Sequence, residues 1–181
     1  YRRQRQMCIR DSIYYYCNDV CAQPTRTEAD ELTYPFHVLI RYKIEKMLFH
    51  NEIESKDIEK VFNHFMQEYF GITPKNKLEG CFQDVHWSGG FGYFPTYALG
   101  SAMSAQFYYT MKKDLDIDAL LRKGDFKPIN LWLKCHVHCY GASKKNLEIL
   151  SFATKEEFNP NYYIRYLKEK FEEIYHCLLY T

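Results

Sequence analysis

The most informative stretch of this 181-residue chain is residues 80–87, which read Gly-Cys-Phe-Gln-Asp-Val-His-Trp. Its last five positions carry an amide, a carboxylate, an imidazole and an indole, and a loop rich in glycine and aromatic residues follows. Burying so many polar groups is costly unless each finds a partner. We therefore expect a site here rather than plain scaffold. A second polar stretch, residues 25–30, reads Thr-Arg-Thr-Glu-Ala-Asp.

Around these two stretches the apolar residues recur every three or four positions, which predicts helices. The longest stripe consists of Leu32, Phe36, Ile40, Ile44, Met47 and Leu48. A second helix is expected after Ser55, its predicted cap, with Gly71 as its stop. Further helices are expected over about 95–113, 116–123, 128–140, 144–152 and 160–175. The predicted fold class is all-α, with at most one short β-hairpin near residues 77–86.

Composition excludes several classes of protein. A net charge of +1 gives no electrostatic reason to expect nucleic acid or an anionic membrane as partner. No apolar run approaches the roughly 18–20 residues of a membrane span, and no signal peptide is recognisable at the start. Seven cysteines form no secreted-scaffold pattern, so reduced thiols and a cytoplasmic location are expected.

The two ends differ in character from the rest of the chain. Residues 1–12 (YRRQRQMCIRDS) and 177–181 (CLLYT) read like translated sequencing-adaptor sequence, and we set both apart from the fold. The helical portion of a single domain is then expected over residues 13–176.

The two polar stretches resemble signature motifs of the carboxypeptidase Taq family of zinc metallocarboxypeptidases, I-R-x-x-A-D and G-x-x-Q-D-x-H-W. The resemblance covers residues 18–175 and implies the C-terminal helical part of a neurolysin-like zincin metallopeptidase fold. Thr25 replaces the isoleucine of the first motif, and the loop after Trp87 is one residue shorter than the family's. The family's H-E-x-x-H motif, which supplies two zinc ligands and a general base, does not occur in this sequence. We therefore expect a fragment without metal ligands.

The resemblance also implies roles for the first motif. Arg26 would anchor the free carboxylate of a substrate, since a guanidinium matches a carboxylate with two hydrogen bonds. Asp30 would belong to the same substrate-binding side. A purely structural alternative is a salt bridge between Arg26 and Glu28 or Asp30.

In the second motif, His86 is the expected catalytic residue. In an extended segment Asp84 and His86 would point to the same side, so the carboxylate would orient the imidazole. His86 would then donate to a carbonyl oxygen as negative charge develops, together with the phenol of Tyr93 or Tyr97. Gln83, Asp84 and Trp87 would support substrate binding. Alternatively, Asp84 and His86 only fix the loop, and the tyrosines only begin a core helix.

The activity that the resemblance implies for the intact protein is hydrolysis of the C-terminal peptide bond of peptides with a free C-terminus. Zinc, or another divalent metal such as cobalt, would activate the attacking water. A homodimer is implied for the intact protein, and the fragment alone is expected to be inactive. The alternatives are a non-catalytic all-α domain for peptide binding and one for dimerisation.

Two other groups of residues could form a site, but the sequence supports them less well. Cys135, His138 and Cys139 share a face of the expected helix and could bind zinc, but no fourth ligand is evident. Cys81 and His86 could suggest a cysteine hydrolase, although nucleophile and base are rarely so close in sequence. Buried free thiols are the commoner outcome.

Overall fold

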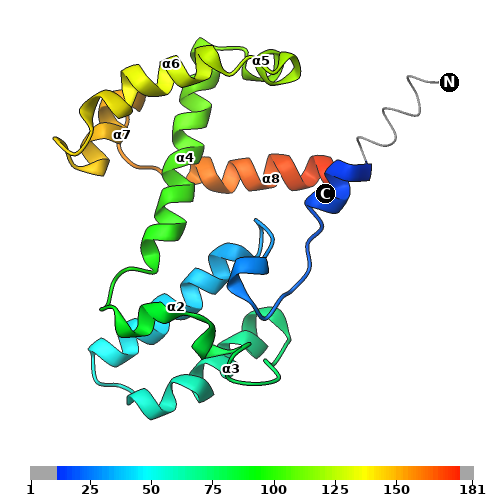
Figure 1. Ribbon diagram of the computed structural model, residues 1–181, viewed down its shortest axis with the longest axis vertical. Coiled ribbons are helices and arrows are strands. Elements are labelled where there is room, and N and C mark those ends of the chain that lie inside the picture. The colour runs from blue at the N-terminus through cyan, green and yellow to red at the C-terminus, as the bar shows by residue number, and fades with distance from the viewer. Residues whose placement is uncertain (1–11, 176–181) are drawn as a thin grey trace. The chain divides into compact units, whose positions relative to one another are not determined.

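The computed structural model describes residues 12–175, so the two segments set apart above lie outside it, except Ser12. The described residues are predominantly helical and contain no strand (Figure 1). This confirms the all-α class. The expected hairpin region instead forms the 3₁₀ helices η3 (Cys81–Gln83) and η4 (Val85–Ser88). None of the described helices is long and apolar enough to cross a membrane.

The chain divides into two compact units, and the boundary falls inside helix α4, between Ala98 and Leu99. The elements of the first unit are η1 (Arg26–Glu28), α2 (Tyr34–Phe49), η2 (Ser55–Asp57), α3 (Ile58–Phe70), η3, η4 and the start of α4 (Pro95–Asp114). Gly71 ends α3 in the left-handed conformation, at φ 68°, as expected from its freedom there. Ser55 is not the cap of α3, because it lies within η2 and Asp57 takes the N-cap position of α3.

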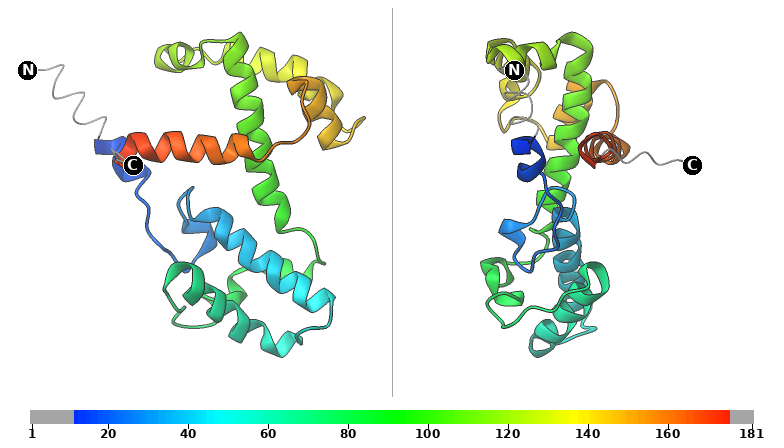
Figure 2. Two further views of the ribbon diagram at one scale, coloured as in Figure 1. Left: turned by 180° about the vertical axis from the view of Figure 1, so that it is seen from behind. Right: turned by 90° about the vertical axis from the view of Figure 1, so that its right-hand side faces the viewer.

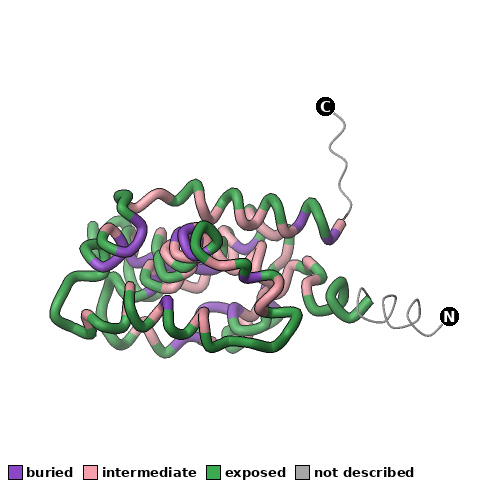
Figure 3. The backbone as a smooth tube through the Cα atoms, turned by 90° about the horizontal axis from the view of Figure 1, so that it is seen from above, coloured by how far each residue is buried: buried purple, intermediate pink, exposed green. Residues whose placement is uncertain are grey.

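The core of the first unit lies between α2 and α3, which run side by side in Figures 1 and 2. Its fully buried members are Ile40, Ile44, Phe62, Met66 and Cys81. Buried and exposed positions alternate along the helices, as the spacing of apolar residues requires (Figure 3). One member of the predicted stripe is not buried: Phe36 is 45% exposed, although its ring lies 6.1 and 6.2 Å from those of Tyr69 and Phe70 in α3.

The second unit contains most of α4 together with α5 (Ile117–Lys123), α6 (Lys127–His136), η5 (His138–Tyr140), α7 (Asn146–Thr154) and α8 (Asn161–Tyr175). Its core includes Met111, Ile117, Trp132 and Ala153. As predicted, Asp116 caps α5, since its carboxylate accepts the N–H of Ala119 at 3.0 Å. The helix expected to reach residue 140 ends earlier, at His136, and residues 138–140 form a 3₁₀ turn.

His37 is a buried polar residue in the first unit. Its side chain is 0% exposed and its ring lies 4.6 Å from that of Phe70. Neither ring nitrogen has a hydrogen-bond partner in the part of the chain that is described. Burial, aided by the positive charges of Arg41 and Arg26, lowers the pKa of His37 to about 4. The folded protein therefore keeps this imidazole neutral at neutral pH.

This burial predicts a pH dependence of stability. Between pH ~6.5 and ~4 the unfolded chain binds a proton that folded His37 does not, so the free energy of unfolding should fall by about 3 kcal/mol. His37→Leu should remove that slope, whereas His64→Leu at an exposed position should keep it. Urea unfolding at a series of pH values measures both, and an unchanged slope in His37→Leu would contradict the prediction.

Candidate functional site

The site is organised around the carboxylate of Asp84, which is bound by two arginines. Arg26 donates from Nε and Nη2 to Oδ1, at 3.0 and 2.8 Å. Arg41 donates from Nε to Oδ2, and its Nη1 donates to the carbonyl of His37 at 2.9 Å. All three residues are less than a tenth exposed. Three segments distant in sequence therefore meet at one carboxylate.

The electrostatics of this cluster favour its charged form. Burial alone would raise the pKa of Asp84, but the charges and hydrogen bonds of Arg41 and Arg26 outweigh burial and lower it. Likewise, Asp84 outweighs burial at Arg26 and raises its pKa. At Arg41 burial dominates and the pKa is lowered. The resulting stabilisation is present above the ordinary pKa of Asp84 and is lost only when the pH falls through the lowered folded value.

Gln83 binds the two polar stretches to each other. Its Oε1 accepts the backbone N–H of Arg26 at 2.7 Å. Its Nε2 donates to the carbonyls of Pro24, Glu79 and Gly80, at 3.0, 2.7 and 2.9 Å. The side chain thus fixes the turn that carries Arg26 against the loop that carries Asp84.

Asp30 stabilises the turn before α2. Its Oδ1 accepts the backbone N–H groups of Leu32 and Thr33, both at 2.9 Å. Its Oδ2 accepts the Thr33 hydroxyl at 2.8 Å and the Cys21 N–H at 3.1 Å. The local salt bridge considered for Arg26 is not formed with Asp30 or Glu28, because Arg26 pairs with Asp84.

His86 lies next to this cluster and contacts both candidate tyrosines. Its Nε2 is 3.0 Å from the hydroxyl of Tyr97, and the Tyr93 ring stacks on the imidazole at 5.1 Å. The Arg26 guanidinium lies over the ring of Tyr97, 4.9 Å from its centre. Burial, with a contribution from Tyr93, raises the pKa of Tyr97. The two motifs therefore converge on one phenol.

The expected relation between Asp84 and His86 is only partly present. His86 Nδ1 lies 3.7 Å from Asp84 Oδ1, which is too long for a hydrogen bond, and it is buried without a partner among the described residues. The segment is not extended as predicted, because η3 and η4 flank Asp84. The arginines occupy the carboxylate instead.

Trp87 packs against Cys81 and Phe94, next to the site. Its indole N–H donates to the Cys81 carbonyl at 2.6 Å, and its ring lies 5.1 Å from that of Phe94. An open pocket of about 230 Å³ adjoins it, lined by Ile58, Phe82, Asp84, Val85, Trp87 and Ser88.

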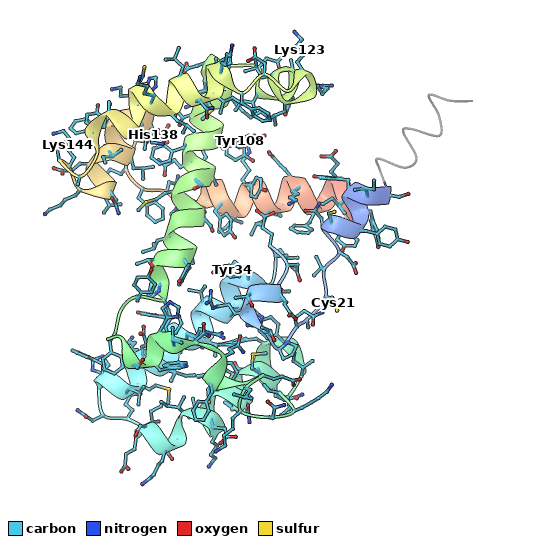
Figure 4. The ribbon with its side chains drawn as sticks, viewed as in Figure 1. Cys21, Tyr34, Tyr108, Lys123, His138 and Lys144 are labelled. Atoms are coloured by element: carbon cyan, nitrogen blue, oxygen red, sulfur yellow. The ribbon has the colours of Figure 1, made fainter. Side chains whose placement is uncertain are left out.

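Three residues of the site were not predicted from the sequence. Arg41 is the second partner of Asp84, and Tyr34, at the start of α2 (Figure 4), accepts a hydrogen bond from Arg26 Nη1 at 3.1 Å. Glu45 is buried, and its Oε2 accepts the N–H of Gly92 at 3.2 Å. Burial raises the pKa of Glu45. Each lies on α2, where a polar residue within an apolar helical pattern gives no sign of its distant partner.

The described residues do not provide a metal site. Nowhere between residues 12 and 175 do three or more His, Cys, Asp or Glu side chains gather so as to hold an ion, the Cys135–Cys139 segment included. His138 lies in η5, beyond the end of α6 (Figure 4). No chemical step through a metal is therefore assigned to these residues.

Comparison with known proteins shows the family to which the chain belongs. Residues 2–171 match the family model of the carboxypeptidase Taq (M32) metallopeptidases. The chain belongs to this family. The match takes in most of residues 1–12, which the sequence alone set apart.

Named relatives agree with the family model. Carboxypeptidase 1 of Bacillus subtilis is 51% identical over 152 residues, covering 83% of this chain and 30% of the relative. Thermostable carboxypeptidase 1 of Pyrococcus furiosus is 40% identical, over 89% of this chain and 33% of its own length. The structure of Trypanosoma cruzi metallocarboxypeptidase 1 is 40% identical, with a TM-score of 0.82 over 87% of this chain and 34% of that one. The chain thus spans about a third of the relatives' length.

The Asp84 cluster predicts a large effect on stability. Asp84→Asn should lower the free energy of unfolding by about 3–5 kcal/mol, because it leaves two buried guanidinium groups without a countercharge. Asp118→Asn is the matched control: its side chain is 54% exposed and 3.5 Å from Lys112, so its effect should stay below about 1 kcal/mol. Urea unfolding at pH 7 compares them, and equal losses would contradict the assignment.

Proposed function

We propose that the intact protein is a metal-dependent carboxypeptidase that hydrolyses the C-terminal peptide bond of peptides, with zinc or another divalent metal such as cobalt held by residues outside this chain. Its described residues would form the side of the site that binds the substrate carboxylate and the carbonyl oxygen. The observation that carries this proposal is the convergence of Arg26 and His86 on Tyr97, at 4.9 Å and 3.0 Å.

Charge supports a role for Arg26 as the carboxylate anchor. Two guanidinium groups face the single carboxylate of Asp84, so the cluster keeps a net positive charge close to His86 and Tyr97. Arg26 donates one N–H from Nε and one from Nη2 to Asp84, and one from Nη1 to the hydroxyl of Tyr34. A guanidinium has five N–H donors, so two remain for a bound carboxylate. An anionic peptide terminus is the ligand that such a site favours.

Geometry supports His86 and Tyr97 as donors to the carbonyl oxygen. A ring nitrogen and a hydroxyl 3.0 Å apart can both reach an oxygen placed between them, and fixed donors stabilise negative charge that develops there. Tyr93 is placed differently, since its ring stacks flat on His86. We assign Tyr97 rather than Tyr93 as the second donor, and Gln83, Asp84 and Trp87 as residues that hold this arrangement.

A chimera tests these roles. The segment of the Bacillus subtilis carboxypeptidase 1 that matches this chain would be replaced by the matching residues of this chain, and release of C-terminal amino acids would be measured. We expect an active chimera in which His86→Gln or Tyr97→Phe lowers kcat by about 10²–10³. Arg26→Gln should chiefly raise KM for peptides with a free C-terminus.

Tyr93→Phe is the matched control and should lower kcat much less than Tyr97→Phe, because it removes a neighbour of Tyr97 and not the donor itself. Full activity of the His86→Gln chimera would refute its catalytic role. If the chimera without any substitution folds but is inactive, the proposal that this chain forms the substrate-binding side of the site is refuted. Loss of stability without any kinetic change in the Arg26 variant would favour a structural domain instead.

The isolated chain gives a second test. Without the H-E-x-x-H motif, which the sequence lacks, it should bind no stoichiometric zinc and release no amino acid from peptides. Metal analysis of the purified chain and an amino-acid release assay measure this. Stoichiometric zinc together with turnover would show that this part carries its own metal centre.

A further inference from the structure

Glu45 is a buried carboxylate to which the proposed mechanism gives no role. It is 4% exposed and lies on α2, one turn after Arg41. Its Oε2 accepts the backbone N–H of Gly92 at 3.2 Å, in the glycine-rich loop that follows Trp87. A carboxylate is costly to bury, so its place in the helix calls for a reason beyond packing.

The loop that Glu45 binds has little in its own sequence to fix its shape. Its residues Gly90 and Gly92 have φ angles of 108° and 90°, which glycine adopts far more readily than other residues. A Cβ atom at either position would meet no atom beyond its chain neighbours within 4 Å, so neither glycine is closely packed. Contacts with α2 therefore hold the loop: the Glu45 hydrogen bond, and the ring of Phe91 edge-on to that of Phe49 at 6.3 Å.

The position of Gly92 bears directly on His86. Tyr93 is the next residue, and its ring stacks on the imidazole with the ring centres 5.1 Å apart and the planes 16° from parallel. The same ring lies edge-on to that of Tyr97 at 5.5 Å. The Nδ1 side of the imidazole gives little further restraint, since Nδ1 has no hydrogen-bond partner among the described residues and lies 3.7 Å from Asp84. The orientation of the imidazole therefore depends on the rings around it, with Tyr93 against its face.

The Glu45 carboxylate is also close enough to the imidazole for the two to interact. Burial raises the pKa of Glu45, while the hydrogen bond from Gly92 and the positive charge of His86 in its protonated form act against burial. Glu45 thus lies beside both the loop and the group that the loop positions.

We propose that Glu45 is a positioning residue for His86. From α2 it holds Gly92 in place, Gly92 places the Tyr93 ring, and this ring keeps the imidazole oriented so that Nε2 stays 3.0 Å from the hydroxyl of Tyr97. The inference rests on the proposed function, because it gives Glu45 a part in placing the imidazole that is proposed to stabilise the carbonyl oxygen. Small displacements of a positioned group are costly to catalysis, so the effect belongs to kcat and not to KM.

Two substitutions separate the hydrogen bond from the charge. Glu45→Gln keeps an oxygen that can accept the Gly92 N–H but removes the charge, whereas Glu45→Asp keeps the charge on a side chain one methylene too short. Proton–carbon NMR of the full chain labelled at histidine gives the Cε1–H signal of His86, which is identified by its loss in His86→Gln. The stacked Tyr93 ring shifts this signal upfield, and Tyr93→Ser supplies the position of the signal without that ring.

We expect Glu45→Asp to move the His86 signal more than half of the way to its position in Tyr93→Ser, and Glu45→Gln to leave it nearly unchanged. Glu52→Ala, which changes an exposed carboxylate just beyond α2, is the control and should not move the signal. If Glu45→Asp does not fold, as circular dichroism would show, Glu45→Met takes its place, because it keeps the length of the side chain and removes the acceptor. A folded Glu45→Asp or Glu45→Met with an unmoved signal would overturn the proposal. So would a signal that moves as far in Glu45→Gln, since the charge would then be the cause.

The chimera with Bacillus subtilis carboxypeptidase 1 gives the kinetic readout. There Glu45→Asp should lower kcat about tenfold and leave KM nearly unchanged, whereas Glu45→Gln should keep most of kcat. An unchanged kcat in Glu45→Asp, where His86→Gln lowers it, would overturn the positioning role. If His86→Gln also leaves kcat unchanged, the catalytic proposal fails, and the NMR result alone decides whether Glu45 orients His86.

Discussion

A single buried carboxylate connects the parts of the first unit. Asp84 accepts hydrogen bonds from Arg26, in the turn before α2, and from Arg41, in the middle of α2. Removing it would leave the Arg41 guanidinium, which is 0% exposed and lies against the rings of Phe62 and Phe94, inside the core without a countercharge. The same ion-pair cluster therefore stabilises the core and fixes the position of Arg26 beside Tyr97.

Helix α2 has two roles that depend on different faces. Its apolar inner face, with Ile40 and Ile44, packs on α3. Arg41 binds Asp84 in the second motif, and Glu45 accepts the N–H of Gly92 in the loop that follows it. The helix therefore joins the core of the first unit to the second motif and its loop.

Local features of the fold could be predicted from the sequence, whereas long-range pairings could not. Gly71 and Asp116 act within a few residues of their own positions, so the sequence next to them suffices to place helix ends. Arg41 reads as an ordinary helical cation, because only the fold reveals that its partner lies 43 residues away. The choice between Tyr93 and Tyr97 likewise depends on how the loop turns after His86, which spacing alone does not determine.

The contacts of Gln83 have a consequence for how this region can change. Its amide binds the backbone at Pro24 and Arg26, so each motif supplies the hydrogen-bond partners of the other. Transferring one motif alone to an unrelated helical protein would leave the Gln83 amide, or the backbone groups of Pro24 and Arg26, without their hydrogen-bond partners. The two segments therefore have to be kept or replaced together, because hydrogen bonds join them although Arg26 and Gln83 are 57 positions apart in the sequence.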